Sequence, residues 1–209
     1  MLILYLLAIA LSSYLLGGIN GAIITSKYFY KKDIRQFGSG NPGLTNFYRV
    51  FGVRGAAMVL AIDILKSVLP VLFGGWLLGR LGMRMLGAET AAFFVMLGHS
   101  YPVYYKFQGG KTVLAAGAAL FIIDLRVAIV SWVVFLCVML ITRFVSLGSI
   151  CAGIAYPISV AAFGLGGPAC IVIAALSGAL LLFRHRPNIV RLLNGTESRI
   201  SFSGRKDKK

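Results

Sequence analysis

The chain has 209 residues, a length typical of one domain, and 58% of them are hydrophobic, with a mean hydropathy of +0.86. This hydropathy excludes an ordinary soluble globular domain, because apolar runs of about 20 residues have the length that crosses a hydrocarbon core. The net charge of +15 comes from 21 Lys and Arg residues against 6 Asp and Glu, which suits nucleic acid, a membrane surface or phosphorylated substrates, so the positions of the charges have to decide.

Apolar runs recur along the chain and predict about seven membrane-spanning helices, because lipid cannot satisfy backbone polar groups. They lie near 2–26, 54–77, 86–105, 112–124, 126–143, 146–164 and 168–184. The run at 112–124 is the weakest. The first run contains no Lys or Arg before Lys27, so we expect a retained span rather than a signal peptide. The predicted fold is an all-α, polytopic membrane helical bundle, one domain over 1–200, with a basic, disordered tail at 201–209 near anionic lipid.

The loop charges predict the orientation of this bundle. With seven spans, seventeen basic residues fall on the side of the first loop and the C-terminal tail, and three fall on the opposite side. The positive-inside rule then places the N-terminus outside and the C-terminus in the cytoplasm. Four polar, glycine-rich segments, at 37–49, 98–112, 142–149 and 184–200, share the cytoplasmic face. We expect a site there, since loops carry function more often than spans do, and we expect no nucleic-acid partner.

The first of these segments reads FGSGNPGLTNFYR. Its glycines allow positive φ and close backbone approach, so successive N–H groups can form a concave anion site. Arg49 offers a planar fork suited to phosphate. The alternative is a simple turn in which Thr45 or Asn46 caps the next helix. The candidate substrate-binding residues here are Ser39, Gly40, Asn41, Thr45, Asn46 and Arg49.

The second segment ends in Gly109, Gly110 and Lys111, followed by Thr112. A nucleotide-binding P-loop needs a glycine where Tyr105 stands, and it needs a strand of a soluble sheet, so ATP binding is rejected. Two glycines and a lysine that open a helix still favour an anion, because the N–H groups and the helix dipole point toward it.

Asp63 and Lys66 lie one helical turn apart inside a span, where charges usually face the bundle interior. They either pair with each other or contact a ligand directly. No Cys/His cluster has metal-ligand spacing, and we expect no metal and no cofactor.

His99 and His185 are the only histidines, and each is either a surface or capping residue or a functional one. Arginines flank His185 and push it toward the neutral form, which suits a proton acceptor. Neither histidine has an Asp five positions later, so the HxxxxD acyltransferase motif is absent. Glu197 is expected to orient Arg191 or Arg199, or to cap a short C-terminal helix.

Taken together, the chain resembles the bacterial membrane-integral glycerol-3-phosphate acyltransferases that use acyl phosphate, the PlsY family. The resemblance covers nearly the whole chain. It rests on GSGNPGLTNFYR (38–49), DILK (63–66), GHSYPVYYKFQGGK (98–111), RFVSLGS (143–149) and HRPNIVRLLNGTESRI (185–200). It implies transfer of an acyl chain from acyl phosphate to the 1-hydroxyl of glycerol 3-phosphate, the first step of bacterial phospholipid synthesis. It also implies the bacterial inner membrane, and an upstream enzyme that makes acyl phosphate from acyl carrier protein.

The resemblance also implies residue roles. His185, Asn188 and Glu197 match the catalytic motif. The implied substrate contacts extend from the first loop to Lys66, His99, Gly109, Gly110, Lys111 and Ser149. Acyl phosphate is already activated, so positioning and charge stabilisation would carry most of the catalysis. Either His185 or the donor's own phosphate takes the hydroxyl proton, and we favour the phosphate because no carboxylate is clearly placed.

The chain departs from the family pattern at Leu44, Ser67, Thr112 and Leu114, and the family's G-S-I-P pattern appears as Gly18-Ile19-Asn20 without the proline. A Cβ at position 112 could narrow the anion site. Two alternatives therefore stand beside the enzyme. One is a transporter for phosphorylated metabolites, which would place polar groups near mid-membrane in internal repeats. The other is a membrane protein that kept the motifs without the activity.

Overall fold

The computed structural model describes residues 1–200, and every regular element in that range is a helix. The longer helices are α1 (Leu2–Gly17), α4 (Val53–Gly79), α5 (Arg84–Ser100), α7 (Leu125–Thr142), α8 (Val145–Ala162) and α9 (Gly167–Arg184). The shorter ones are α2 (Gly21–Phe29), α3 (Leu44–Phe51), α6 (Val113–Ile123) and α10 (Arg186–Leu193), with 3-10 turns η1 (Ile34–Gln36) and η2 (Val103–Tyr105). The all-α prediction is confirmed for these residues, and the basic tail predicted at 201–209 lies outside them.

In the described part of the chain, residues 1–200, five helical segments are long and apolar enough to cross a membrane, at 2–29, 53–79, 125–142, 145–162 and 167–184. The chain is therefore a multi-pass membrane protein. Helix α5 has 17 residues. Helix α6 has 11 residues, so at 1.5 Å per residue it covers only about half of a 30 Å hydrocarbon core.

The first span differs from the continuous helix predicted at 2–26, because the helix is interrupted between Gly17, where α1 ends, and Gly21, where α2 begins. Asn20 causes the new start: its side chain accepts a hydrogen bond from the Ile23 amide at 2.9 Å, as an N-cap residue does. Its amide group also donates to the carbonyl of Pro42 at 3.1 Å. Through this second hydrogen bond, Asn20 ties the first polar loop to the end of the bundle.

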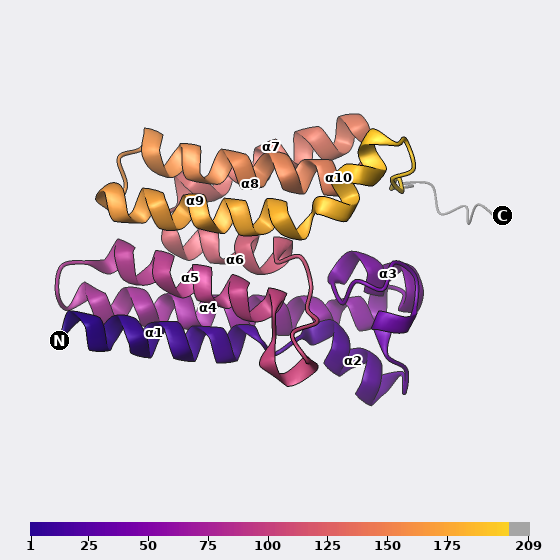
Figure 1. Cartoon of the computed structure of the whole chain (residues 1–209), viewed down its shortest axis with the longest axis horizontal. Helices are drawn as coiled ribbons and strands as arrows, with labels where there is room; N and C mark the ends of the chain where they lie inside the picture. Colours follow the sequence, from indigo (N-terminus) through magenta and orange to yellow (C-terminus); the bar gives the residue numbers. More distant parts are fainter. Residues whose placement is uncertain (201–209) are drawn as a thin grey trace.

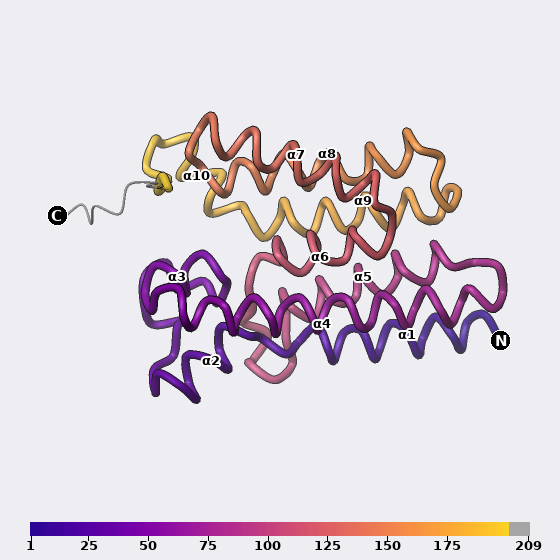
Figure 2. The backbone as a smooth tube through the Cα atoms, turned by 180° about the vertical axis from the view of Figure 1, so that it is seen from behind, coloured from indigo at the N-terminus to yellow at the C-terminus, as the bar shows by residue number. Residues whose placement is uncertain are grey.

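The helices form two layers. Helices α1, α4 and α5 make one layer and α7, α8 and α9 the other, with α6 between them (Figures 1 and 2). Small residues bring the backbones close, as is usual in membrane bundles. A Cβ on Gly74 of α4, for example, would lie 2.5 Å from the carbonyl oxygen of Gly87 on α5. Substitution there would force the two helices apart.

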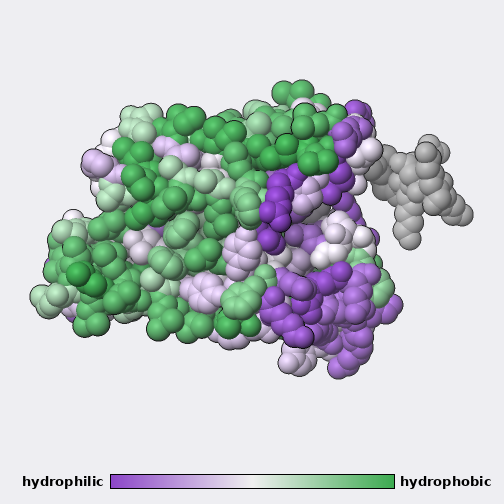
Figure 3. Space-filling model, in the orientation of Figure 1, coloured by the Kyte–Doolittle hydropathy of each residue, from purple (hydrophilic) through white to green (hydrophobic). Residues whose placement is uncertain are grey.

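Polar residues gather at one end of the molecule. Figure 3 shows a hydrophilic end where α2, α3 and α10 lie, and a largely hydrophobic surface along the rest of the bundle. Outward-facing leucines such as Leu4, Leu7 and Leu11 of α1 and Leu140 of α7 are more than half exposed, which suits contact with lipid chains. The N-terminus lies at the opposite end from α10 (Figure 1).

Candidate active site

A cavity of about 690 Å³ opens at the polar end. Its walls come from the loop before α3, the end of α5, the start of α6, the start of α8, and α10 with the residues that follow it. Eleven of the candidate residues line it: Ser39, Asn41, Thr45, Asn46, Arg49, His99, Lys111, Ser149, His185, Asn188 and Glu197. Gly40, Lys66, Gly109 and Gly110 do not. The four polar segments therefore do meet in one place.

The side chain of Asn46 closes the first loop. Its oxygen accepts from the Ser39 amide at 2.9 Å, and its nitrogen donates to the Phe37 carbonyl at 3.0 Å. The loop turns at Gly38 and Gly40, whose φ angles of 59° and 70° favour glycine. With both of its polar atoms bonded inside the loop, Asn46 shapes the cavity wall and is less available to a ligand.

The predicted cap of the next helix is wrong. Helix α3 begins at Leu44 with Gly43 as N-cap, and neither Thr45 nor Asn46 makes a capping bond. Among residues 1–200, the amides of Leu44, Thr45 and Asn46 have no hydrogen-bond acceptor. These three residues line the cavity. The positive end of α3 is therefore open toward the space that Arg49 also borders.

A second helix N-terminus faces the same cavity. Helix α6 begins at Val113, directly after the GGKT segment, as predicted. Its N-cap Thr112 has a φ of 66°, a conformation that favours glycine, and its hydroxyl donates to the Lys111 carbonyl at 2.6 Å. Burial, and then the charge of Arg191, lower the pKa of Lys111 to about 8. Two helix dipoles and Lys111 thus make this wall attractive to an anion.

Gly109 and Gly110 support Lys111 from behind the wall. The Gly110 amide donates to the carbonyl of His99 at 3.0 Å. A Cβ on Gly110 would lie 3.1 Å from Cδ2 of the His99 ring and still closer to Nε2. The two glycines are therefore needed because the loop packs directly on the end of α5.

Asp63, Lys66 and His99 form a buried cluster beneath the cavity. The Lys66 ammonium lies 2.7 Å from Asp63 Oδ1, from the Ile19 carbonyl oxygen and from His99 Nδ1. These partners use all three ammonium hydrogens. Of the two possibilities that the sequence left open for Asp63 and Lys66, the structure therefore shows the ion pair. Lys66, which the resemblance implied as a substrate contact, has no ammonium hydrogen left for a substrate. Asp63 and His99 do reach the cavity wall.

His185 presents an acceptor to the cavity. Its Nδ1 donates to the Leu181 carbonyl at 2.9 Å, which leaves the lone pair on Nε2. Burial is the main reason that the pKa of His185 falls to about 4, although the bond to Leu181 opposes the fall. Asn188 adds a second acceptor, because its buried Oδ1 has no hydrogen-bond partner within residues 1–200. Both acceptors belong to residues that line the cavity.

Glu197 links the start of α8 to α10 at the edge of the cavity. Its Oε1 accepts from Ser146 Oγ and from Asn188 Nδ2, both at 2.8 Å. Its Oε2 accepts from Arg191 Nε at 2.7 Å. Of the two arginines considered from the sequence, Arg191 is therefore the partner. Burial raises the pKa of Glu197, but these hydrogen bonds outweigh it and leave the pKa below its ordinary value.

Sequence reasoning did not list Asp63, Ser146 or Arg191 as site residues, although all three line the cavity. Arg191 had one signal, since it precedes Glu197, the only acid in the segment 184–200, by six positions. Ser146 had only its place in the RFVSLGS motif, in which Ser149 was the implied contact. The hydrogen bond from Ser146 to Glu197 joins α8 to the segment that follows α10.

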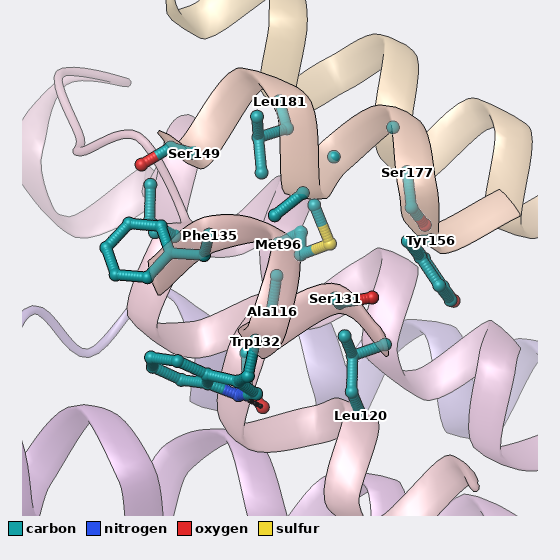
Figure 4. Close-up of a pocket in the computed structure, with 15 residues that line it drawn as sticks. Met96, Ala116, Leu120, Ser131, Trp132, Phe135, Ser149, Tyr156, Ser177 and Leu181 are labelled. Atoms are coloured by element: carbon teal, nitrogen blue, oxygen red, sulfur yellow. Dashed lines mark hydrogen bonds between the residues drawn. The ribbon is translucent and has the colours of Figure 1, made fainter. Parts of the chain in front are cut away.

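A smaller, mainly apolar pocket of about 50 Å³ lies inside the bundle, between α5, α6, α7, α8 and α9 (Figure 4). It shares Val113, Trp132, Phe135 and Ser149 with the polar cavity. Trp132 is held in place by a hydrogen bond of 3.2 Å from its indole N–H to the Gly117 carbonyl. Phe135 and Trp132 lie on one side of the pocket, and Tyr156 and Ser177 lie on the other (Figure 4).

This combination defines a class: a helical membrane protein with an anion-attracting cavity at its polar end and an apolar pocket beside it. The family model described as glycerol-3-phosphate acyltransferase matches residues 7–195. The chain belongs to this family, the PlsY family of acyltransferase enzymes.

The similarity extends over nearly the full length of the relatives. The chain is 38% identical to the glycerol-3-phosphate acyltransferase of Thermoanaerobacter pseudethanolicus, with 94% of this chain and 96% of that one covered. It is 40% identical to that of Carboxydothermus hydrogenoformans, with 91% and 94% covered. It also matches the crystal structure of PlsY in the glycerol 3-phosphate form, with a TM-score of 0.84, 35% identity, and 94% and 96% covered.

Proposed function

We propose that the protein transfers an acyl chain from acyl phosphate to the 1-hydroxyl of sn-glycerol 3-phosphate. The products are 1-acylglycerol 3-phosphate and inorganic phosphate. The single observation that carries this proposal is the cavity in which two open helix N-termini, Arg49 and Lys111 surround a space beside an apolar pocket, with four lining residues in common. Both substrates carry phosphate, and one of them carries an apolar chain. Membership in the family and the glycerol 3-phosphate form of a solved relative support it.

The phosphate groups would bind at the positive walls. Arg49 offers a fork to one phosphate, and Ser39, Asn41 and Thr45 add neutral donors beside the open end of α3. Lys111 and the open end of α6 would neutralise a second phosphate, with Ser149 beside them. The anionic donor and the anionic acceptor would otherwise repel each other, so this positive charge is what lets both stand in one cavity.

The apolar pocket would take the part of the acyl chain nearest the reacting carbon. It begins at the shared residues Val113, Trp132, Phe135 and Ser149. The carbonyl carbon would then lie at the boundary between the polar cavity and the bundle, which is where an amphiphilic donor changes from a charged to an apolar part.

In the proposed reaction, the 1-hydroxyl oxygen forms a bond to the acyl carbon, and the bond from that carbon to the bridging phosphate oxygen breaks. The hydroxyl proton goes to the departing phosphate. The neutral acceptors His185 Nε2 and Asn188 Oδ1 would hold the glycerol hydroxyls in line. We assign the proton to the phosphate because the pKa of His185, at about 4, makes it a weak base, and three donors already hold Glu197.

The proposed topology has seven crossings, by α1, α4, α5, α6, α7, α8 and α9, with the N-terminus outside and the cavity on the cytoplasmic face of the bacterial inner membrane. An odd number of crossings agrees with the N-terminus and α10 lying at opposite ends of the bundle (Figure 1). Thiol labelling of intact cells tests the orientation. Leu81→Cys should react with an impermeant maleimide, and Asn194→Cys should react only after permeabilisation. The reverse pattern would contradict the proposed orientation.

The activity test supplies purified protein with acyl phosphate and glycerol 3-phosphate and measures lysophosphatidate and phosphate. Arg49→Ala and Lys111→Ala should each lower kcat/KM by about 100-fold or more, since each removes charge-assisted bonds. The exposed residues Arg54 and Lys106, changed to Ala, are the matched controls and should stay near wild type. Folded wild-type protein that forms no product would refute the proposal.

A further inference from the structure

Arg184, the last residue of α9, grips the loop that carries Lys111. Its Nη2 donates to the Gly109 carbonyl at 2.8 Å, and its Nε donates to the Gly110 carbonyl at 3.0 Å. The guanidinium also lies over the ring of Tyr101, 5.0 Å from its centroid. Arg184 does not line the cavity, so this contact is not a substrate contact.

The other side of the same loop is held by α5. The Gly110 amide donates to the His99 carbonyl, and a Cβ on Gly109 would lie 2.8 Å from the Ser100 carbonyl oxygen. Gly109 and Gly110 are therefore clamped between the end of α5 and the end of α9. The next residue along the chain is Lys111, whose side chain reaches the cavity.

Arg184 directly precedes His185 in the chain, and His185 also lines the cavity. His185 is itself fixed, because its Nδ1 donates to the Leu181 carbonyl one turn back on α9. The two hydrogen bonds of Arg184 thus join the wall that carries Lys111 to the wall that carries His185. The two walls belong to segments more than seventy positions apart in the chain.

We propose that Arg184 is a positioning residue that sets the spacing between Lys111 and His185, and so between the acyl phosphate and the glycerol hydroxyl that attacks it. This inference rests on the proposed function for its catalytic consequence. Arginine suits the task because its planar fork can reach two neighbouring carbonyls at once, whereas a lysine ammonium is a point charge on a flexible stem. A displacement of about 1 Å in such a site can cost about 100-fold in rate.

The test compares Arg184→Lys and Arg184→Gln with Arg186→Lys and Arg186→Gln. Arg186 is the matched control, because it is exposed and its guanidinium lies over the Phe183 ring, 4.5 Å from the centroid, in the adjoining turn. Both Arg184 variants should lose about 100-fold in kcat, with KM changed much less, while both Arg186 variants stay within about 2-fold. Unchanged kcat in folded Arg184→Lys would overturn the inference.

Hydrogen exchange separates this inference from the proposed function, because it needs no substrate. Amides of residues 106–112 should exchange faster in Arg184→Gln than in wild type, and Arg186→Gln should match wild type. Equal protection in Arg184→Gln and wild type would overturn the clamp even if the enzyme assay succeeded. Faster exchange in Arg184→Gln, together with a wild-type protein that forms no product from the two substrates, would support the hydrogen bonds of Arg184 to the loop and contradict the proposed function.

Rescue gives a third readout that a general loss of folding would not produce. Arg184→Ala leaves space for a free guanidinium ion, which should restore part of kcat at concentrations far below those that unfold the protein. Guanidinium should have no such effect on Arg186→Ala. Failure of guanidinium to restore any activity, in Arg184→Ala protein that melts like wild type, would contradict a role through these two carbonyl bonds.

Discussion

Lys66 donates a hydrogen bond to Nδ1 of His99 across 2.7 Å, from α4 to α5, while the same ammonium pairs with Asp63. The bond fixes the histidine proton on Nε2, the ring nitrogen that packs toward Gly110. Through this bond, the buried Asp63–Lys66 ion pair is joined to His99, which lines the cavity. The ammonium hydrogens of Lys66 are all used within this cluster and by the Ile19 carbonyl.

Removing one member of this cluster should be more harmful than removing two. Lys66→Met leaves Asp63 buried without its partner and should cost about 3 kcal/mol or more of stability, seen as a lower unfolding midpoint in detergent. Asp63→Leu combined with Lys66→Met should recover much of the loss. Lys27→Met breaks a partly exposed pair with Asp33, and it should cost less than about 1 kcal/mol. Equal effects of Lys66→Met and Lys27→Met would contradict this account.

The alkaline limb of the rate profile should report Lys111. Its pKa is lowered to about 8 by burial and the charge of Arg191, and further charges from Glu197, Arg184 and Arg49 act on it. A lysine is charged below its pKa, so kcat/KM should fall as the pH rises through about 8. Lys111→Arg keeps its charge to higher pH and should move that limb upward, whatever its absolute rate. A limb that stays in place in Lys111→Arg would belong to another group.

His185 should not contribute an acid limb near its ordinary pKa of about 6.5, because burial lowers that pKa to about 4. His185→Gln should lower kcat by removing the Nε2 acceptor, yet keep the shape of the profile between these two values. A limb that comes from a substrate phosphate, with a second pKa of about 6, persists in the variant. A limb near pH 6.5 that disappears in His185→Gln would instead identify His185 as the base.

The wall between the two cavities should control which acyl chains react. A Cβ on Gly117 would lie 2.8 Å from Cζ2 of Trp132, so Gly117→Ala should push the indole into the shared wall. Activity with long acyl phosphates should then fall more than activity with short ones, as measured by kcat/KM across a chain-length series. Gly75→Ala is the control, because its Cβ would meet only ordinary contacts at 3.6 Å. A uniform loss across the series would argue against an acyl pocket here.

Much of this arrangement could be predicted from the sequence. Hydropathy and charge alone predicted the helical membrane class and the gathering of four polar segments, because lipid and the positive-inside rule act on composition rather than on detailed contacts. The start of α6 after GGKT followed from glycines next to an apolar run. The family motifs added the identities of most residues that line the cavity.

The pairings across the bundle could not be predicted in the same way. The break at Asn20 depends on Pro42, the loop closure by Asn46 depends on Phe37, and the grip of Arg184 depends on Gly109. Each of these hydrogen bonds joins residues that come close only when the chain has folded. The local sequence pattern therefore does not predict them. The cap expected at Thr45 or Asn46 was wrong for a related reason, since the Asn46 side chain is taken by the loop.

The central claim is that Arg49 and Lys111 make one phosphate-binding cavity, and calorimetric titration of glycerol 3-phosphate into the purified protein tests it most directly. Wild type should bind saturably. Arg49→Ala removes the fork assigned to this phosphate and should weaken binding by about 10- to 100-fold, since a charged hydrogen bond contributes about 1.5–3 kcal/mol. Lys111→Ala, which removes the charge assigned to the acyl phosphate, should weaken it much less. Arg54→Ala and Lys106→Ala should bind as wild type does. Equal affinity of all five proteins would contradict the account.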